Sequence, residues 1–90
     1  MSKILAIFRV PDMSKEQYDN IMKDLENAGM YKVKTRSTHI MAPNKTGSIV
    51  VDVWDSEAAL NEFFGTLGPI LEKNGVNPPP PEIYPVHNEI

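Results

Sequence analysis

Cysteine is absent from the sequence, and histidine occurs only twice. The lack of cysteine excludes disulfides, thiolate nucleophiles, and zinc or iron–sulfur sites with cysteine ligands. His39 and His87 form no helical His-x-x-x-His pair, so we expect no metal site. A glycine-rich phosphate loop and the nucleophile elbow of hydrolases are also missing from the sequence. We therefore expect no bound cofactor.

An excess of positive charge and a long apolar run are missing as well. Nine Lys and Arg residues against twelve Asp and Glu residues give a formal net charge of −3, which argues against a nucleic-acid partner. The apolar stretch Ile4 to Val10 is too short to span a membrane, and no small-residue cleavage site follows it. We expect a cytoplasmic protein with no membrane partner, and the lack of cysteine fits a reducing compartment.

Ninety residues suffice for one domain with one core, over residues 1–90. The stretch Ile4 to Val10 has the length of a strand and is stopped by Pro11. Ser14 then predicts a helix N-cap, with Gln17 completing a capping box. Gly29 predicts the end of this helix. Its buried stripe has helical spacing and comprises Tyr18, Ile21, Met22, Leu25 and Ala28.

The middle of the chain predicts a β-hairpin. We expect one strand over Tyr31 to Ala42, in which Lys32, Lys34 and Arg36 alternate with less polar residues and form a solvated edge that could alternatively bind an anion. The segment Pro43 to Gly47 is expected to be the loop, and Ser48 to Trp54, rich in β-branched residues, the next strand.

The remaining residues predict a second helix and a fourth strand. Asp55 and Ser56 are expected to cap the helix, and Gly75 to end it. Within it, Gly65 and the Gly68-Pro69 step predict a bend or a restart. A stiff proline connector should lead into a strand over Glu82 to His87, interrupted by Pro85.

This order of elements predicts an α+β protein with the ferredoxin-like βαββαβ fold and a four-stranded antiparallel sheet of order 4-1-3-2. The two strands expected at the centre are the most apolar, and Pro85 suits an edge strand. Both faces of the central strands are apolar, whereas two helices can cover only one face of the sheet. We therefore expect a homodimer formed through the other face.

Four segments together resemble small bacterial proteins of the dimeric α/β-barrel superfamily. These segments are His39 to Trp54 (HIMAPNKTGSIVVDVW), Asp55-Ser56-Glu57, Leu67-Gly68-Pro69 and Pro85-Val86-His87-Asn88. Within that superfamily the chain most resembles the antibiotic-biosynthesis-monooxygenase-like group. The resemblance implies a homodimeric α/β barrel. Its members include cofactor-free oxygenases acting on aromatic polyketides, haem-degrading enzymes, lactone isomerases and proteins with no assigned function, so the fold does not decide the activity.

His39 and Asp52 are the candidate catalytic residues. The His39 imidazole could shuttle a proton, or it could be a structural histidine beside the hairpin. Asp52 interrupts an apolar strand, so it needs a polar partner, and a buried carboxylate could act as a base. Its alternative role is an ion pair at the dimer interface. A five-residue loop would pair His39 with Val51, whereas a four-residue loop would pair it with Val50 and place it on the face of Asp52 and Trp54.

Further residues are candidates for ligand binding. Trp54 could stack on a flat ligand or belong to the core. His87 and Asn88 could bind a ligand, with His87 reaching a pocket as an acid/base group, or both could tie two copies of the chain together. An apolar pocket between helices and sheet, or alternatively plain core, would include Tyr18, Met22, Met30, Met41, Phe63 and Phe64.

Two functions follow from these residues and the resemblance. The first is an enzyme that oxidises or isomerises a small aromatic or apolar metabolite without a cofactor, in a dry cavity that supplies a base. The second is a non-catalytic, dimeric small-molecule-binding or accessory module. Haem degradation is disfavoured, because the haem-degrading relatives use an Asn early in the first strand and Ile4 to Val10 contains none.

Overall fold

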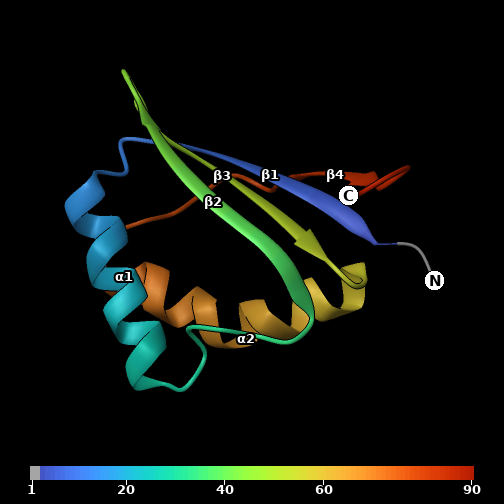
Figure 1. Ribbon diagram of the computed structural model, residues 1–90. Helices are drawn as coiled ribbons and strands as arrows, with labels where there is room; N and C mark the ends of the chain where they lie inside the picture. Colours follow the sequence, from blue (N-terminus) through green and yellow to red (C-terminus); the bar gives the residue numbers. More distant parts are fainter. Residues whose placement is uncertain (1–2) are drawn as a thin grey trace.

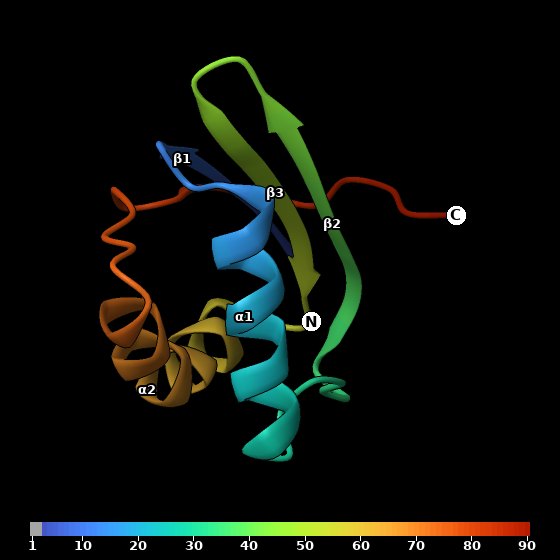
Figure 2. The same cartoon turned by 90° about the vertical axis from the view of Figure 1, so that its left-hand side faces the viewer.

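The computed structural model describes residues 3–90, which follow the predicted β-α-β-β-α-β order (Figure 1). The elements are β1 (Ile4–Pro11), α1 (Lys15–Asn27), β2 (Arg36–Asn44), β3 (Gly47–Trp54), α2 (Glu57–Lys73) and β4 (Glu82–Pro85). The strands form one antiparallel sheet of order β2-β3-β1-β4, which confirms the predicted strand order. Both helices lie on the same face of the sheet (Figures 1 and 2). This α+β arrangement is compatible with a ferredoxin-like fold.

Local sequence signals determine where α1 begins and ends. The Ser14 hydroxyl accepts a hydrogen bond from the Gln17 backbone N–H, and the Gln17 side chain accepts one from the Ser14 backbone N–H, so the predicted capping box is present. At the other end Gly29 has φ +75°, and the Met30 N–H donates to the Leu25 carbonyl. The Gly29 N–H donates to the Glu26 carbonyl. Together the two bonds form the expected Schellman motif, which satisfies two otherwise unpaired carbonyls of the last turn.

Helix α2 differs from the expectation of a restart. It runs without interruption through Gly65, Gly68 and Pro69. Because Pro69 lacks an N–H, it makes no bond back to the preceding turn, but the helix continues since its apolar side is packed against the core. Ser56 caps its start as predicted, by accepting the Ala59 N–H.

The predicted second strand began too early. Residues 31–35 form a loop, and β2 starts at Arg36, which pairs with Trp54, the last residue of β3. Residues before Arg36 therefore have no strand opposite them. Thr35 instead accepts the backbone N–H of Asp55. Lys32 and Lys34 consequently lie in this loop and not along a sheet edge, which corrects the predicted strand of alternating cations.

The hairpin loop is also shorter than predicted. The pairing of β2 with β3 extends to Asn44 and Gly47, leaving two residues between the strands. Pro43 lies within β2 because this is an edge strand, where a missing N–H costs no ladder hydrogen bond. The Asn44 side chain accepts the Thr46 N–H at 2.9 Å and so stabilises the tight turn.

The two faces of the sheet bury their residues differently. On the face toward the helices, Ala6, Phe8 and Trp54 are buried, and they pack with both helices in one core. The opposite face is here called the outer face, and strand alternation determines which residues lie on it. It contains the apolar residues Leu5, Ile7, Ile40, Ile49, Val51 and Val53. Ile40 is 56% exposed on this face.

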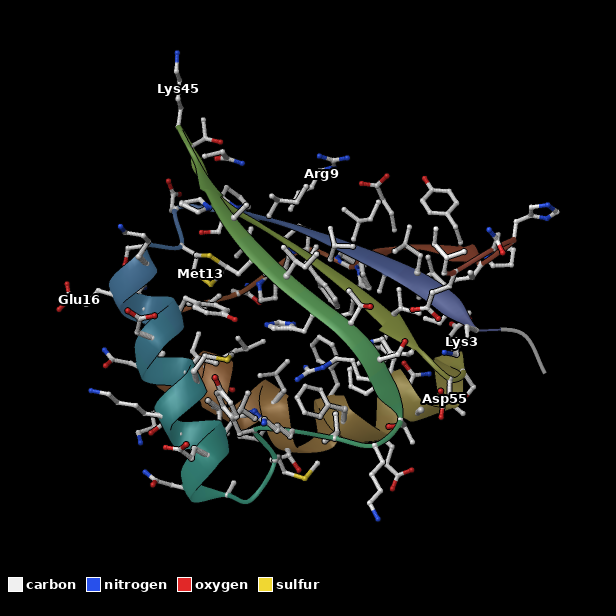
Figure 3. The ribbon with its side chains drawn as sticks, in the orientation of Figure 1. Lys3, Arg9, Met13, Glu16, Lys45 and Asp55 are labelled. Atoms are coloured by element: carbon white, nitrogen blue, oxygen red, sulfur yellow. The ribbon has the colours of Figure 1, made fainter. Side chains whose placement is uncertain are left out.

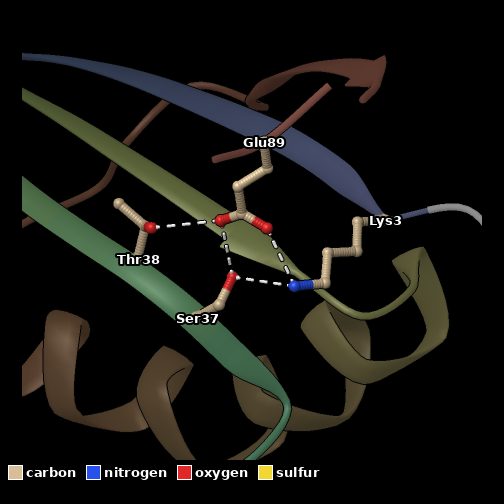
Figure 4. A network of polar contacts seen from close by, with 4 residues as sticks. All are labelled: Lys3, Ser37, Thr38 and Glu89. Carbon is tan, nitrogen blue, oxygen red and sulfur yellow. Dashed lines mark hydrogen bonds and ion pairs between the residues drawn. The ribbon is translucent and has the colours of Figure 1, made fainter. Parts of the chain in front are cut away.

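The C-terminal segment, residues 86–90, crosses part of the outer face (Figure 4). The Val86 N–H donates to the Lys3 carbonyl, beside the start of β1. The Glu89 carboxylate accepts hydrogen bonds from Lys3 at 2.8 Å and from Ser37 at 3.1 Å, so the segment reaches from β1 to β2. Val53 lies between these strands and is buried. Strand β4 itself ends at Pro85, earlier than predicted.

No helix within residues 3–90 is long and apolar enough to span a lipid bilayer.

Candidate functional site

A line of four hydrogen-bonded side chains crosses from α1 to β3. The Tyr18 hydroxyl lies 2.6 Å from His39 Nε2, and His39 Nδ1 lies 2.5 Å from Asp52 Oδ1. The second carboxylate oxygen, Asp52 Oδ2, accepts the indole N–H of Trp54 at 3.3 Å. One residue comes from α1, one from β2 and two from β3. The sequence-derived pair His39 and Asp52 is therefore brought together, and Tyr18 extends it.

The direction of these hydrogen bonds follows from the donors available. The indole N–H can only donate, and an ionised Asp52 can only accept, so Nδ1 of a neutral His39 carries the proton. Nε2 then accepts the hydrogen of the Tyr18 hydroxyl. This places the basic nitrogen of the imidazole toward Tyr18, with Asp52 fixing the orientation and tautomer of the ring.

The hairpin places His39 on the face shared by Asp52 and Trp54. His39 pairs directly with Asp52, which neither the four-residue nor the five-residue loop considered above would produce. The two-residue loop shifts the pairing, yet it retains the face that makes a His–Asp–Trp arrangement. Asp52 is only 4% exposed, so its carboxylate depends on His39 and Trp54 as its hydrogen-bond donors.

A narrow cavity of about 60 Å³ lies between the two helices and the sheet, beside this line of residues. His39 and Asp52 form a polar part of its wall. The other predicted binding residues on its wall are Tyr18, Met22, Phe63 and Phe64. The remaining wall is largely aliphatic, and Figure 3 shows how side chains, Met13 among them, fill the space between helices and sheet.

Five of the sequence-derived candidates lie off the cavity wall, and two of them, Met30 and Met41, are partly buried against the core instead. Trp54 has no exposed surface and supports the site from behind, through its bond to Asp52 and its contact with Phe63 at 5.0 Å between ring centroids. His87 and Asn88 are exposed in the C-terminal segment and line none of the cavities described here in residues 3–90.

Burial changes the acidity of the Tyr18 hydroxyl. Its removal from water raises the pKa of Tyr18 above the usual value of 10.0, and the carboxylate of Asp52 acts in the same direction, while Arg36 opposes them. Tyr18 therefore stays protonated at neutral pH and remains a hydrogen-bond donor to His39.

Arg36 is a site residue that the sequence analysis did not assign to the cavity. Its guanidinium lies 5.5 Å from the ring centroid of Trp54 and 5.4 Å from that of Phe63. An irregularity in the pairing of β2 leaves Ser37 without a partner, and this bulge turns Arg36 to the same face as His39. Strand alternation alone would put Arg36 and His39, three residues apart, on opposite faces.

In comparisons with known proteins, no family model and no curated protein matches the sequence. Within residues 3–90, no group of three or more His, Asp or Glu side chains is placed to hold a metal ion.

Proposed function

We propose that the protein is a homodimer of the dimeric α/β-barrel type, similar to the antibiotic-biosynthesis-monooxygenase-like group. Its cavity takes a small aromatic or apolar metabolite, and His39 accepts a proton from that molecule without the help of a bound cofactor. The observation that carries this proposal is the hydrogen-bonded line Tyr18–His39–Asp52, which ends at the wall of an apolar cavity.

The proton transfer uses groups that are already oriented. Asp52 stabilises the positive charge that His39 gains when Nε2 takes a proton, because Oδ1 faces the Nδ1–H at hydrogen-bonding distance. The metabolite contributes an acidic hydroxyl, or a C–H next to a carbonyl. When a C–H is broken, its electron pair moves onto the carbonyl oxygen as an enolate, and the Tyr18 hydroxyl, displaced from Nε2 by the ligand, donates its hydrogen bond to that oxygen.

Both activities implied by the resemblance begin with this step. Isomerisation requires a metabolite with a further conjugated double bond, so that His39 can return the proton to a different carbon of the extended enolate, with no net change in oxidation state. Oxidation requires dioxygen as a second substrate, and converting a CH₂ group to C=O then releases one water. The apolar wall excludes bulk water, which favours either outcome over reprotonation by solvent.

Ligand entry requires movement in the cavity. An engineered apolar cavity that binds benzene measures about 150 Å³, whereas this one measures about 60 Å³. Met22 on the wall has a flexible side chain that adopts new rotamers at low cost. The Tyr18 hydroxyl already donates a hydrogen bond to His39 Nε2, so a phenolic ligand has to replace Tyr18 as the donor.

The outer face supports the proposed dimer. Its apolar residues lie on β1, β2 and β3, with Ile40 exposed, and the ion pair of Arg9 with Glu82 lies beside them on the same face. A second copy of the sheet, related by a two-fold axis, covers such a face. Analytical ultracentrifugation at micromolar concentration is expected to give the mass of two chains, and a monomer at that concentration would contradict this part of the proposal.

A non-catalytic binding module is the second candidate function. It is favoured by the small volume of the cavity and by the bond that already saturates His39 Nε2. In this case the line of polar residues would serve only to hold the helix against the sheet.

Ligand binding is tested by NMR of the two histidine rings. 4-Methylphenol is expected to shift the ring resonances of His39 and to leave those of exposed His87 unchanged, because only His39 lies on the cavity wall. Toluene, which lacks the hydroxyl, is the matched ligand control and should bind more weakly. Equal shifts at both histidines, or none at His39, would overturn the proposed site.

Catalysis is tested by deuterium exchange. Phenylacetone in D₂O exchanges its α-hydrogens when His39 removes a proton, exchanges it with solvent at its partly exposed ring and returns a deuteron, so the wild-type protein should accelerate this exchange. The His39→Gln variant should lose the acceleration, while the matched variant His87→Gln should keep it. If wild type and His39→Gln exchange at the same rate, the binding module becomes the better account.

A further inference from the structure

The structure assigns an anion-binding position to Arg36, and we infer that the metabolite of the proposed site is a small aromatic anion, such as an aryl carboxylate. This inference rests on the proposed function. It concerns which class of ligand the cavity selects, with the ring in the apolar cavity and the negative group at the guanidinium.

Arg36 is a half-buried cation without a carboxylate partner. Among residues 3–90, no Asp or Glu oxygen lies within salt-bridge distance of its guanidinium, and the side chain's one direct hydrogen bond goes to the Tyr31 carbonyl at 3.2 Å. The rings of Trp54 and Phe63 hold the planar group in place. Several of its N–H donors therefore remain available, in a fork geometry that suits a carboxylate.

Arg36 and His39 stand between two hollows. Both residues line the apolar cavity, and both also line an open polar hollow of about 330 Å³ at the β2 side. Lys32 adds a second cation to the polar hollow, and no acidic residue lines it, although the chain as a whole is acidic. A ligand that spans both hollows would meet an apolar wall at one end and positive charge at the other.

Two acidic groups close to the site, Asp52 and Glu89, do not neutralise this position. Asp52 lines only the apolar cavity, and its two oxygens are occupied by His39 and Trp54. Glu89 reaches Ser37 from the outer face and is paired with Lys3 at 2.8 Å. The guanidinium thus faces the polar hollow as a charge that an anionic ligand can pair with.

The test compares three ligands that share one ring. 4-Hydroxyphenylacetate has the carboxylate, 4-hydroxyphenylacetamide is its neutral analogue, and 4-methylphenol lacks the group altogether. Dissociation constants are measured by NMR titration of the wild-type protein. The carboxylate is expected to bind about tenfold more tightly than the amide, as a charge-assisted pair provides. This preference should shrink as sodium chloride is raised, because screening acts on the charge alone.

Variants locate the effect. Arg36→Met retains an unbranched apolar stem and should abolish the preference for the carboxylate, while its affinity for 4-methylphenol stays within about twofold. Arg36→Lys retains the charge and should keep part of the preference. Lys45→Met, at the exposed hairpin tip (Figure 3), removes one cation far from the hollow and should change nothing.

The outcomes separate the two proposals. If 4-methylphenol binds at His39 but the carboxylate binds no better than the amide, the anion position is wrong and the proposed function stands. If Arg36→Met retains the full preference, another cation is responsible and the assignment to Arg36 is wrong. If none of the three ligands perturbs His39, both the proposed site and this inference fail.

Discussion

Replacement of Asp52 tests how strongly the buried carboxylate supports the site. In Asp52→Ala, the Trp54 indole N–H and His39 Nδ1 both lose their partner. Each buried donor left without an acceptor costs about 1–3 kcal/mol. Trp54 has no exposed surface and cannot bond to water instead, whereas the His39 side chain is 21% exposed and recovers part of its loss. We therefore expect a destabilisation of about 2–4 kcal/mol.

Asp52→Asn should behave differently, although it removes the same charge. The amide oxygen can accept the Trp54 indole N–H, and the amide NH₂ can donate to His39 Nδ1 once the imidazole proton moves to Nε2. Trp54 and His39 Nδ1 stay satisfied, and only the Tyr18 hydroxyl has to turn its hydrogen away from Nε2, so the expected cost is about 1 kcal/mol. His39 then has the opposite tautomer and can no longer accept a proton at Nε2, so the deuterium exchange described above should be lost in a folded protein.

The measurements are thermal unfolding and ¹⁵N NMR of the His39 ring. For a domain of this size, about 1 kcal/mol corresponds to about 4–8 °C in Tm, so Asp52→Ala should unfold at least about 8 °C lower and Asp52→Asn less far below wild type. Asp55→Ala, which replaces an exposed carboxylate next to β3, is the matched control and should change Tm little. Equal Tm values for Asp52→Ala and wild type would refute the argument, as would an unchanged His39 tautomer in Asp52→Asn.

Three further predictions concern the rest of the fold. The pKa of Glu89 is lowered, chiefly by its hydrogen bond from Lys3, so its contribution to stability is present above its ordinary pKa near 4.5 and is lost as pH falls through the lowered value. The protection factor of the Val86 amide, which corrects for the intrinsic pH dependence of hydrogen exchange, should therefore fall on acidification, and Glu89→Gln should have a low protection factor at every pH. Gly29→Val should lower the free energy of unfolding by about 1 kcal/mol or more, because φ is +75° at Gly29, even though a Cβ there would have open space. The control Gly65→Ala, within α2, should be neutral or stabilising. Equal denaturation midpoints for the two variants would show that the backbone argument is wrong. Ile40→Lys should convert the proposed dimer to a monomer in sedimentation experiments, while Ile40→Val should leave it a dimer. If the lysine variant is still a dimer, the dimer interface does not include Ile40.

Much of the fold could be predicted because its signals are local. The capping box at Ser14 and the Schellman motif at Gly29 involve residues within one or two turns, so sequence spacing determines them. The start of β2 could not be predicted in the same way. Residues 31–35 alternate like a strand, but pairing needs a partner, and β3 offers none beyond Trp54. A strand boundary of this kind depends on the length of its neighbour, which local alternation does not contain.

The candidate site shows the same distinction between local and non-local signals. The shared face of His39 and Asp52 depended on loop length, which was open from sequence because Pro43 could end the strand or lie within it. Tyr18 was assigned to a pocket, but its bond to His39 depends on how α1 sits on the sheet.

The position of Arg36 in the site could not be predicted for a third reason. One bulged residue, Ser37, reverses the alternation, so every strand residue before it faces the side opposite to the one counted from His39. The bulge brings a cation onto the face that already carries an imidazole and a buried carboxylate, and all three line one cavity. Because bulges of this kind often lie beside binding sites and re-aim a side chain, the irregularity at Ser37 is itself an argument that this face of β2 is used for recognition rather than only for packing.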